Sequence, residues 1–133
     1  GIAAAIKLNK PSVRVIGVES ASGPALQMSL KEGKPVRLTR GPTIADGMGA
    51  PFVGELNIEH ARAFVDEFVT VDDEDIKNAM RWILQRNKLL VEGAGAGSTA
   101  AFLSGKTKVA SGAKVVTILS GGNIDFERLK GII

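Results

Sequence analysis

Apolar, β-branched runs that alternate with helical sequence constrain the fold of this chain more than any other feature. Residues 13–19 and 114–119 are two such runs, and each is predicted to be a strand buried on both faces. A shorter strand is predicted at residues 68–71. Buried strands that alternate with helices predict an α/β structure, a mostly parallel sheet with flanking helices. The 133 residues contain no repeat or linker and are expected to form a single α/β segment.

Helical periodicity and strong helix formers predict the remaining elements. Helices are expected at residues 1–8, 23–30, 55–65, 72–90, 98–103 and 124–130. In the longest of them Asp72 is the expected N-cap. The acidic residues that follow it in the first turn are interpreted as capping rather than as a metal site. The glycine-rich residues 93–97 are expected to break the chain before the helix at 98–103.

Composition excludes several classes of function. The chain has no Cys and a single His, which excludes a disulfide framework, a thiolate metal site and a site built from several imidazoles. The net charge is +3, aromatic residues make up 5% and the basic residues are scattered, so we expect no nucleic-acid partner. No apolar run reaches the roughly 18–20 residues of a membrane span. With no signal-like start either, we expect a cytoplasmic protein without a membrane partner.

The most informative pattern for chemistry follows the run at 114–119. Ser120 comes directly after this predicted strand, and Gly121, Gly122 and Asn123 come next. Open α/β sheets bind ligands at the carboxyl ends of their strands, where a hydroxyl, two glycines and a helix N-terminus can meet a ring or a phosphate. A tight turn in which Ser120 only caps the next helix explains the same spacing. The spacing alone does not separate these two interpretations.

The other candidates for a functional role are single ionisable residues and one turn that contains such a residue. Glu92 lies among apolar and glycine residues, so we expect it to be partly buried and to need either a structural partner or a task. Asp46 and Gly47 form a common turn pair. Glu19, at the end of the first strand, is either a ligand-side carboxylate or a solvated strand end. His60 lies in a polar stretch of a helix and is expected to face solvent.

Taken together, four segments resemble a known family. They are residues 16–19 (IGVE), 43–47 (TIADG), 88–95 (KLLVEGAG) and 118–123 (ILSGGN), and they occur in this order in threonine dehydratases and serine racemases. The opening residues, GIAAAIK, resemble the helix just after that family's tetraglycine phosphate loop. The resemblance covers essentially the whole chain. It implies a pyridoxal-phosphate enzyme of the tryptophan-synthase-β-like fold, in which residues 1–133 form the second half of the larger domain.

The resemblance also implies a set of cofactor-binding positions. They are Gly47, Glu92, Ser120, Gly121, Gly122 and Asn123. Ser120 matches the serine whose hydroxyl meets the pyridine nitrogen of the cofactor, and the two glycines after it leave room for the ring edge. Gly47 resembles a backbone position beside the ring, and Glu92 a carboxylate near the 3′-hydroxyl side. Asn123 also resembles a position that lines a nucleotide effector site in animal serine racemases.

Other parts of the family site have no match in the chain. The Schiff-base lysine, the substrate-carboxylate loop and the small domain precede this region in the family, and no lysine here lies in a matching segment. We therefore expect no catalytic residue in this chain and no activity from it alone. The absent Met and the uncapped first helix are interpreted as a cut just past the phosphate loop. The expected partners are an amino-acid substrate, the remainder of the parent enzyme and further copies in a homo-oligomer.

The implied activity is the dehydration of L-threonine, and of L-serine, to a 2-oxo acid and ammonia. Alternatives within the same fold are serine racemase and other enzymes of β-elimination or β-replacement. A non-catalytic binding or assembly module is the alternative from another class. Glu19 and Gly23 match two positions of the divalent-cation site of serine racemases. The third position holds Ala25 instead of an aspartate, so we expect no tightly held metal.

Overall fold

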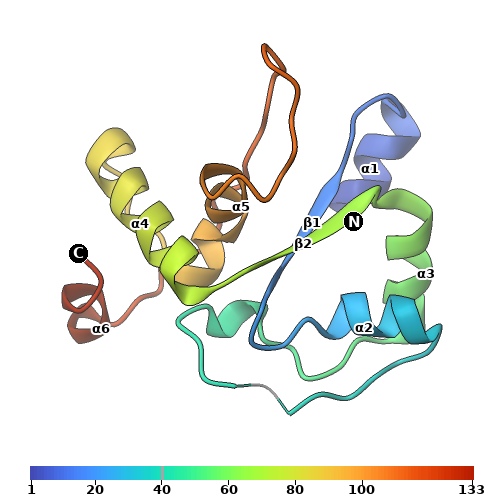
Figure 1. The fold of residues 1–133 in the computed structure, drawn as a ribbon, viewed down its shortest axis with the longest axis horizontal. Helices are drawn as coiled ribbons and strands as arrows, with labels where there is room; N and C mark the ends of the chain where they lie inside the picture. Colours follow the sequence, from blue (N-terminus) through green and yellow to red (C-terminus); the bar gives the residue numbers. More distant parts are fainter. Residues whose placement is uncertain (40) are drawn as a thin grey trace.

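A parallel pair of strands lies at the centre of the structure. The computed structural model describes residues 1–39 and 41–133. Strand β1 (Ile16–Ser20) pairs with β2 (Glu67–Val71) in a register that runs from Ile16 opposite Glu67 to Ser20 opposite Val71. Figure 1 shows helices on both sides of this pair. The predicted α/β class with a parallel sheet is confirmed.

Helices account for the regular secondary structure outside this pair in the described residues. They are α1 (Ile2–Asn9), α2 (Ala25–Glu32), α3 (Glu55–Phe64), α4 (Asp73–Asn87), α5 (Gly93–Leu103) and α6 (Phe126–Lys130), with a short 3-10 helix, η1 (Asp46–Met48). In Figure 1, α1 and α3 lie to one side of the strands and α4 and α5 to the other. All the predicted helices are present, with ends that differ by up to five residues from the expected ones. In the described part of the chain, no helix is long and apolar enough to cross a membrane.

The core lies between α4, α5 and the end of β2. One face of α4 buries Ile76, Ala79, Met80 and Ile83, as its helical periodicity predicts. The facing residues on α5 are small and fully buried, which lets the two helix axes come close. Val71 closes the core at the end of β2. The longest helix of the chain is thus held by the glycine- and alanine-rich helix that follows it.

Two predictions about strands are wrong. Residues 114–119 form no strand, and all of them except the half-buried Thr117 are exposed, with Val116 89% accessible. Their contacts go to side chains of α5: the hydroxyl of Ser98 donates to the carbonyl of Ile118 at 2.7 Å. No neighbouring strand edge faces them in the described residues, and β-branched sequence forms a strand only where such an edge is available. Residues Ile16–Glu19 of β1 are half-buried for a related reason, because within the described part of the chain β2 is the one strand that pairs with β1.

The prediction of a chain break at residues 93–97 is also wrong. Helix α5 begins at Gly93 and runs straight through the glycines. Glycine costs about 0.5–1 kcal/mol relative to alanine inside a helix, so sequence propensity argues against this helix. Gly93 and Gly95 are buried against neighbouring backbone and Gly97 against the Met48 side chain, and this close packing offsets the cost.

The start of α4 is fixed by a capping box. The Asp72 carboxylate accepts from the backbone N–H of Asp75 at 2.9 Å, and the Asp75 carboxylate accepts from the N–H of Asp72. Lys106 forms ion pairs with both carboxylates. The N–H of Asp75, together with the Lys106 ammonium, holds the pKa of the Asp72 carboxyl below its ordinary value. The predicted capping role of the acidic run is confirmed for Asp72 and Asp75.

Replacing Asp72 tests this cap. We expect Asp72→Ala to lower the free energy of unfolding by about 1 kcal/mol, because the N–H of Asp75 loses its acceptor. Asp72→Asn keeps an acceptor and should recover most of that stability. Because the pKa of Asp72 is lowered on folding, the advantage of wild type over Asp72→Ala should persist at neutral pH. It should fade as the pH falls below the ordinary carboxyl pKa of about 3.9. Guanidinium unfolding over a pH series measures this, and an Asn variant as weak as the Ala variant would contradict the cap.

Candidate functional site

Glu92 joins two of the segments singled out in the sequence. It is the N-cap residue of α5, and its backbone N–H donates to the carbonyl of Gly121 at 3.2 Å. Its carboxylate oxygen Oε2 accepts from the backbone N–H of Asn123 at 3.0 Å. Gly121 itself has a φ of +79°, a left-handed conformation that favours glycine. The expectation that Glu92 is partly buried is confirmed, and its carboxylate has a structural partner.

The loop that carries Gly47 also lies against Glu92. A Cβ at Gly47 would come within 2.9 Å of the Cβ of Ala94 and 3.6 Å of Oε1 of Glu92. The loop is fixed to the first turn of α4, since the Asp73 carboxylate accepts from the hydroxyl of Thr43 at 2.5 Å and from the N–H of Ile44 at 3.1 Å. Segments more than 40 residues apart in the sequence therefore meet at the N-terminus of α5.

The glycines of α5 allow the backbones of both segments to approach. A Cβ at Gly93 would lie 2.4 Å from the carbonyl oxygen of Ile44, and one at Gly95 would lie 1.9 Å from the carbonyl oxygen of Ser120. A helix has about 3.6 residues per turn, so these two positions face opposite sides of α5. Gly95 therefore faces the segment after residue 119, while Gly93 faces the loop at 43–49. These packing positions were missed in the sequence, where only the alternate spacing of the glycines points to them.

An ion pair also links α6 to the Gly47 loop. Arg128 on α6 lies 3.1 Å from the Asp46 carboxylate, and both side chains are about half exposed. Asp125 caps α6 by accepting from the backbone N–H of Glu127 and of Arg128. Helix α6 follows Asn123 closely, so this pair also links the segment after Ser120 to the Gly47 loop.

Ser120 is exposed at the edge of this cluster. Among the described residues its hydroxyl has no hydrogen-bond partner, so the interpretation that it caps the next helix is wrong. Asp125 takes that role. The carbonyl oxygen of Ser120 is seated against Gly95. The structure therefore gathers Gly47, Glu92, Gly121 and Asn123 in one place and leaves the Ser120 hydroxyl free beside them.

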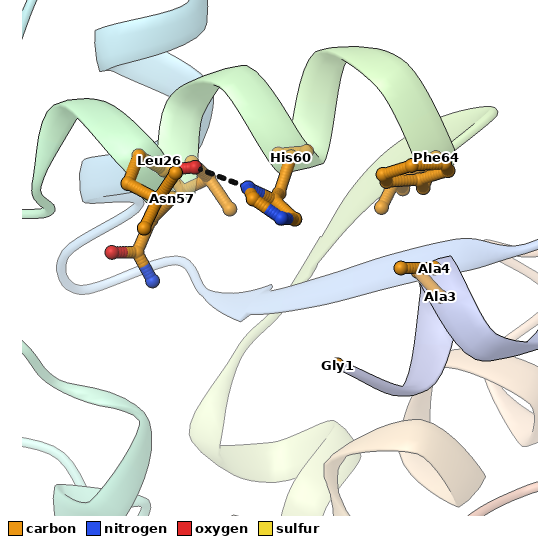
Figure 2. Close-up of a pocket in the computed structure, with 10 residues that line it drawn as sticks. Gly1, Ala3, Ala4, Leu26, Asn57, His60 and Phe64 are labelled. Atoms are coloured by element: carbon orange, nitrogen blue, oxygen red, sulfur yellow. Dashed lines mark hydrogen bonds between the residues drawn. The ribbon is translucent and has the colours of Figure 1, made fainter.

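Two other residues considered in the sequence lie elsewhere. The Glu19 carboxylate accepts from the N–H groups of Leu26 and Gln27 at 2.8 Å each, so it caps α2. His60 is exposed, as predicted, and its Nδ1 lies 2.9 Å from the carbonyl of Leu56. It lines a depression of about 370 Å³ between α1, α2 and α3, which Figure 2 shows with Gly1 and Phe64. Within the described residues, no group of three or more His, Asp or Glu side chains is placed to hold a metal ion.

Comparison with known proteins identifies the family. The model of a family described as pyridoxal-phosphate dependent enzyme matches residues 1–121. The chain belongs to this family. The resemblance seen in the four sequence segments is therefore confirmed, and so is the cofactor that it implies for the family.

Proteins similar to this chain include amino-acid lyases and a racemase. An L-threonine ammonia-lyase of Thermotoga maritima is 41% identical over the whole chain, which covers 33% of that protein. A catabolic L-threonine dehydratase of Escherichia coli is 42% identical over 99% of the chain and 40% of its own length. The solved structure of maize serine racemase is 36% identical, with a TM-score of 0.86 over 98% of this chain and 40% of that one. The chain thus spans about a third to two fifths of these relatives.

The glycine contacts of α5 generate a direct test. We expect Gly95→Ala to destabilise the protein by about 1–3 kcal/mol, because the new methyl group meets the backbone of Ser120, which cannot move without shifting its loop. Gly97→Ala is the matched control in the same helix. Its methyl group would meet only the sulfur and terminal carbon of Met48, a flexible side chain that can move aside. Denaturant unfolding measures both, and equal stabilities of the two variants would contradict the assigned contact.

Proposed function

We propose that this chain forms the pyridine-nitrogen side of the cofactor site in an enzyme that dehydrates L-threonine and L-serine. The products would be a 2-oxo acid and ammonia. Support comes from the relatives named as threonine ammonia-lyase and dehydratase, which are 41–42% identical over essentially the whole chain. The observation that carries the proposal is the hydroxyl of Ser120, which has no hydrogen-bond partner among the described residues. The backbone of Ser120 packs on Gly95, and the turn that follows it is bound by Glu92.

The exposed edge of the site fits a flat ring. Gly47, Gly121 and Gly122 are all exposed and present only backbone atoms, so a planar group can approach without meeting a side chain. A Cβ at Gly121 would fill the space against Glu92, and one at Gly47 would fill the space against Ala94. These residues would form the wall of the site, and Ser120 would supply its polar group.

Ser120 would set the protonation of the ring nitrogen. Pyridoxal phosphate supplies an electron sink for the electron pair left at the substrate α-carbon. The Ser120 hydroxyl is neutral, so it can donate a hydrogen bond to an unprotonated nitrogen without stabilising a positive charge there. A carboxylate at the same position would favour the protonated nitrogen. A weaker sink favours rapid loss of the β-hydroxyl over reactions that need a long-lived carbanion.

We further propose that the rest of a longer enzyme completes the site. The chain spans 33–40% of the relatives that it matches, and no lysine in it matches the family's lysine segment. The exposed apolar side chains of residues 115–119 would lie against that remainder, which would provide their missing neighbour. In this arrangement residues 1–133 form the second half of the larger domain.

Serine racemase is the second candidate. The maize serine racemase structure has a TM-score of 0.86 and 36% identity with this chain. Product analysis with L-serine separates the two activities, because a racemase yields D-serine whereas a dehydratase yields a 2-oxo acid. Ala25 stands where the cation site of serine racemases has an aspartate, and this favours the dehydratase.

The role of Ser120 has a matched test in the full-length enzyme. We expect Ser120→Asp to retain bound cofactor but to lower threonine dehydration by at least about tenfold, because the carboxylate changes the protonation of the ring nitrogen. Ser111→Asp makes the same chemical change in an exposed loop and should leave the rate unchanged. Steady-state turnover together with the absorbance of bound cofactor measures this. Normal turnover by Ser120→Asp would refute the proposed role.

A further inference from the structure

We propose that Glu92 is a positioning residue that holds the turn after Ser120 in place instead of contacting the cofactor. This inference rests on the proposed function, because it concerns how Ser120 is aimed at the ring nitrogen. It replaces the expectation that the Glu92 carboxylate lies near the 3′-hydroxyl of the cofactor. Three features of the structure support it.

The first feature is a pair of hydrogen bonds from one residue to both ends of the turn. The N–H of Glu92 donates to the carbonyl of Gly121, and its carboxylate accepts from the N–H of Asn123. Asn123 is exposed, and the Glu92 carboxylate is the acceptor that the described residues offer to its N–H, so this bond holds the turn at its far end. Glu92 thereby fixes the turn both before and after Gly122.

The second feature is how closely this chain surrounds the carboxylate. A Cβ at Gly121 would lie 2.6 Å from Oε1 and 2.7 Å from Cδ of Glu92, so the backbone of Gly121 packs directly on this group. Gly47 lies near the same oxygen, with a Cβ position 3.6 Å away. Since Oε2 is engaged by Asn123, both oxygens are directed at backbone of the two loops.

The third feature is that α5 contacts the backbone both at Ser120 and at the residue that follows it. The carbonyl of Ser120 is seated on Gly95, and the residue after it is held by Glu92. Both contacts come from the start of α5: Gly95 is buried in its first turn, and Glu92 is its partly buried N-cap. Ser120 is thus located by α5 on both sides, and only its side chain is left to project outward.

These contacts need an acceptor of the right length but not a negative charge. Glutamine has the same length and offers a carbonyl oxygen to the Asn123 N–H. Leucine has a similar size and offers no acceptor. A residue that touched the cofactor through its charge would behave differently, because glutamine and leucine would both remove that charge.

The test compares Glu92→Gln and Glu92→Leu in the full-length enzyme. Hydrogen–deuterium exchange of the peptide that spans residues 120–125 is measured after removal of the cofactor, and the affinity for added pyridoxal phosphate is measured next. We expect Glu92→Leu to speed exchange in this peptide and to weaken cofactor affinity by about tenfold. Glu92→Gln should stay within about threefold of wild type in both measurements. Glu59→Leu, an exposed position on α3, is the matched control and should change neither.

Each outcome decides the matter. Unchanged exchange in Glu92→Leu would overturn the proposal, and so would a loss of cofactor affinity in Glu92→Gln as large as in Glu92→Leu. If Glu92→Leu fails to fold, Glu92→Gln decides by itself: behaviour near wild type supports the proposal and a tenfold loss of affinity overturns it. A wild-type enzyme without dehydratase activity would contradict the proposed function, while exchange in the cofactor-free protein would still report on the turn.

Discussion

The candidate site depends on how closely backbone can approach the first turns of α5. Gly93 and Gly95 lack the side chains that would collide with the carbonyls of Ile44 and Ser120. With alanine at these positions the helix would be intrinsically more stable, by about 0.5–1 kcal/mol each, but neither loop could lie where it does. The glycines therefore lower the stability of the helix but let the backbone of both loops pack against it. Glu92, at the start of the same helix, binds the loop that follows Ser120.

Much of the fold could be predicted from the sequence, because periodicity and capping are local properties. The spacing of Ile76, Ala79, Met80 and Ile83 identifies the buried face of α4, and Asp72 marks its start correctly. Local rules fail at α5, whose glycines are explained only by neighbours distant in the sequence. They fail again at residues 114–119, where apolar composition predicts a buried strand but no strand edge is available in the described chain.

The site itself could be predicted in part. The motifs at 43–47, 88–95 and 118–123 are far apart in the sequence, and the structure places them around one helix end. The expectation that Glu92 needs a partner follows from the cost of burying a carboxylate, but the identity of that partner does not. That partner is the backbone N–H of Asn123, and the residue type at a position does not show which backbone N–H binds a carboxylate. The capping role of Glu19 was missed for a similar reason, since its partners are also backbone groups.

The chain belongs to a family of pyridoxal-phosphate dependent enzymes, and under the proposed function these contacts all shape one site. In the proposed site, α5 locates a neutral hydroxyl opposite the ring nitrogen, and the glycines beside it form a wall free of side chains. The most direct test is a crystal structure of the full-length enzyme with its cofactor bound. We expect the Ser120 hydroxyl oxygen to lie within about 3.2 Å of the pyridine nitrogen, with the Asn123 N–H still on Glu92. A ring nitrogen that faces any other side chain would contradict the role assigned to Ser120.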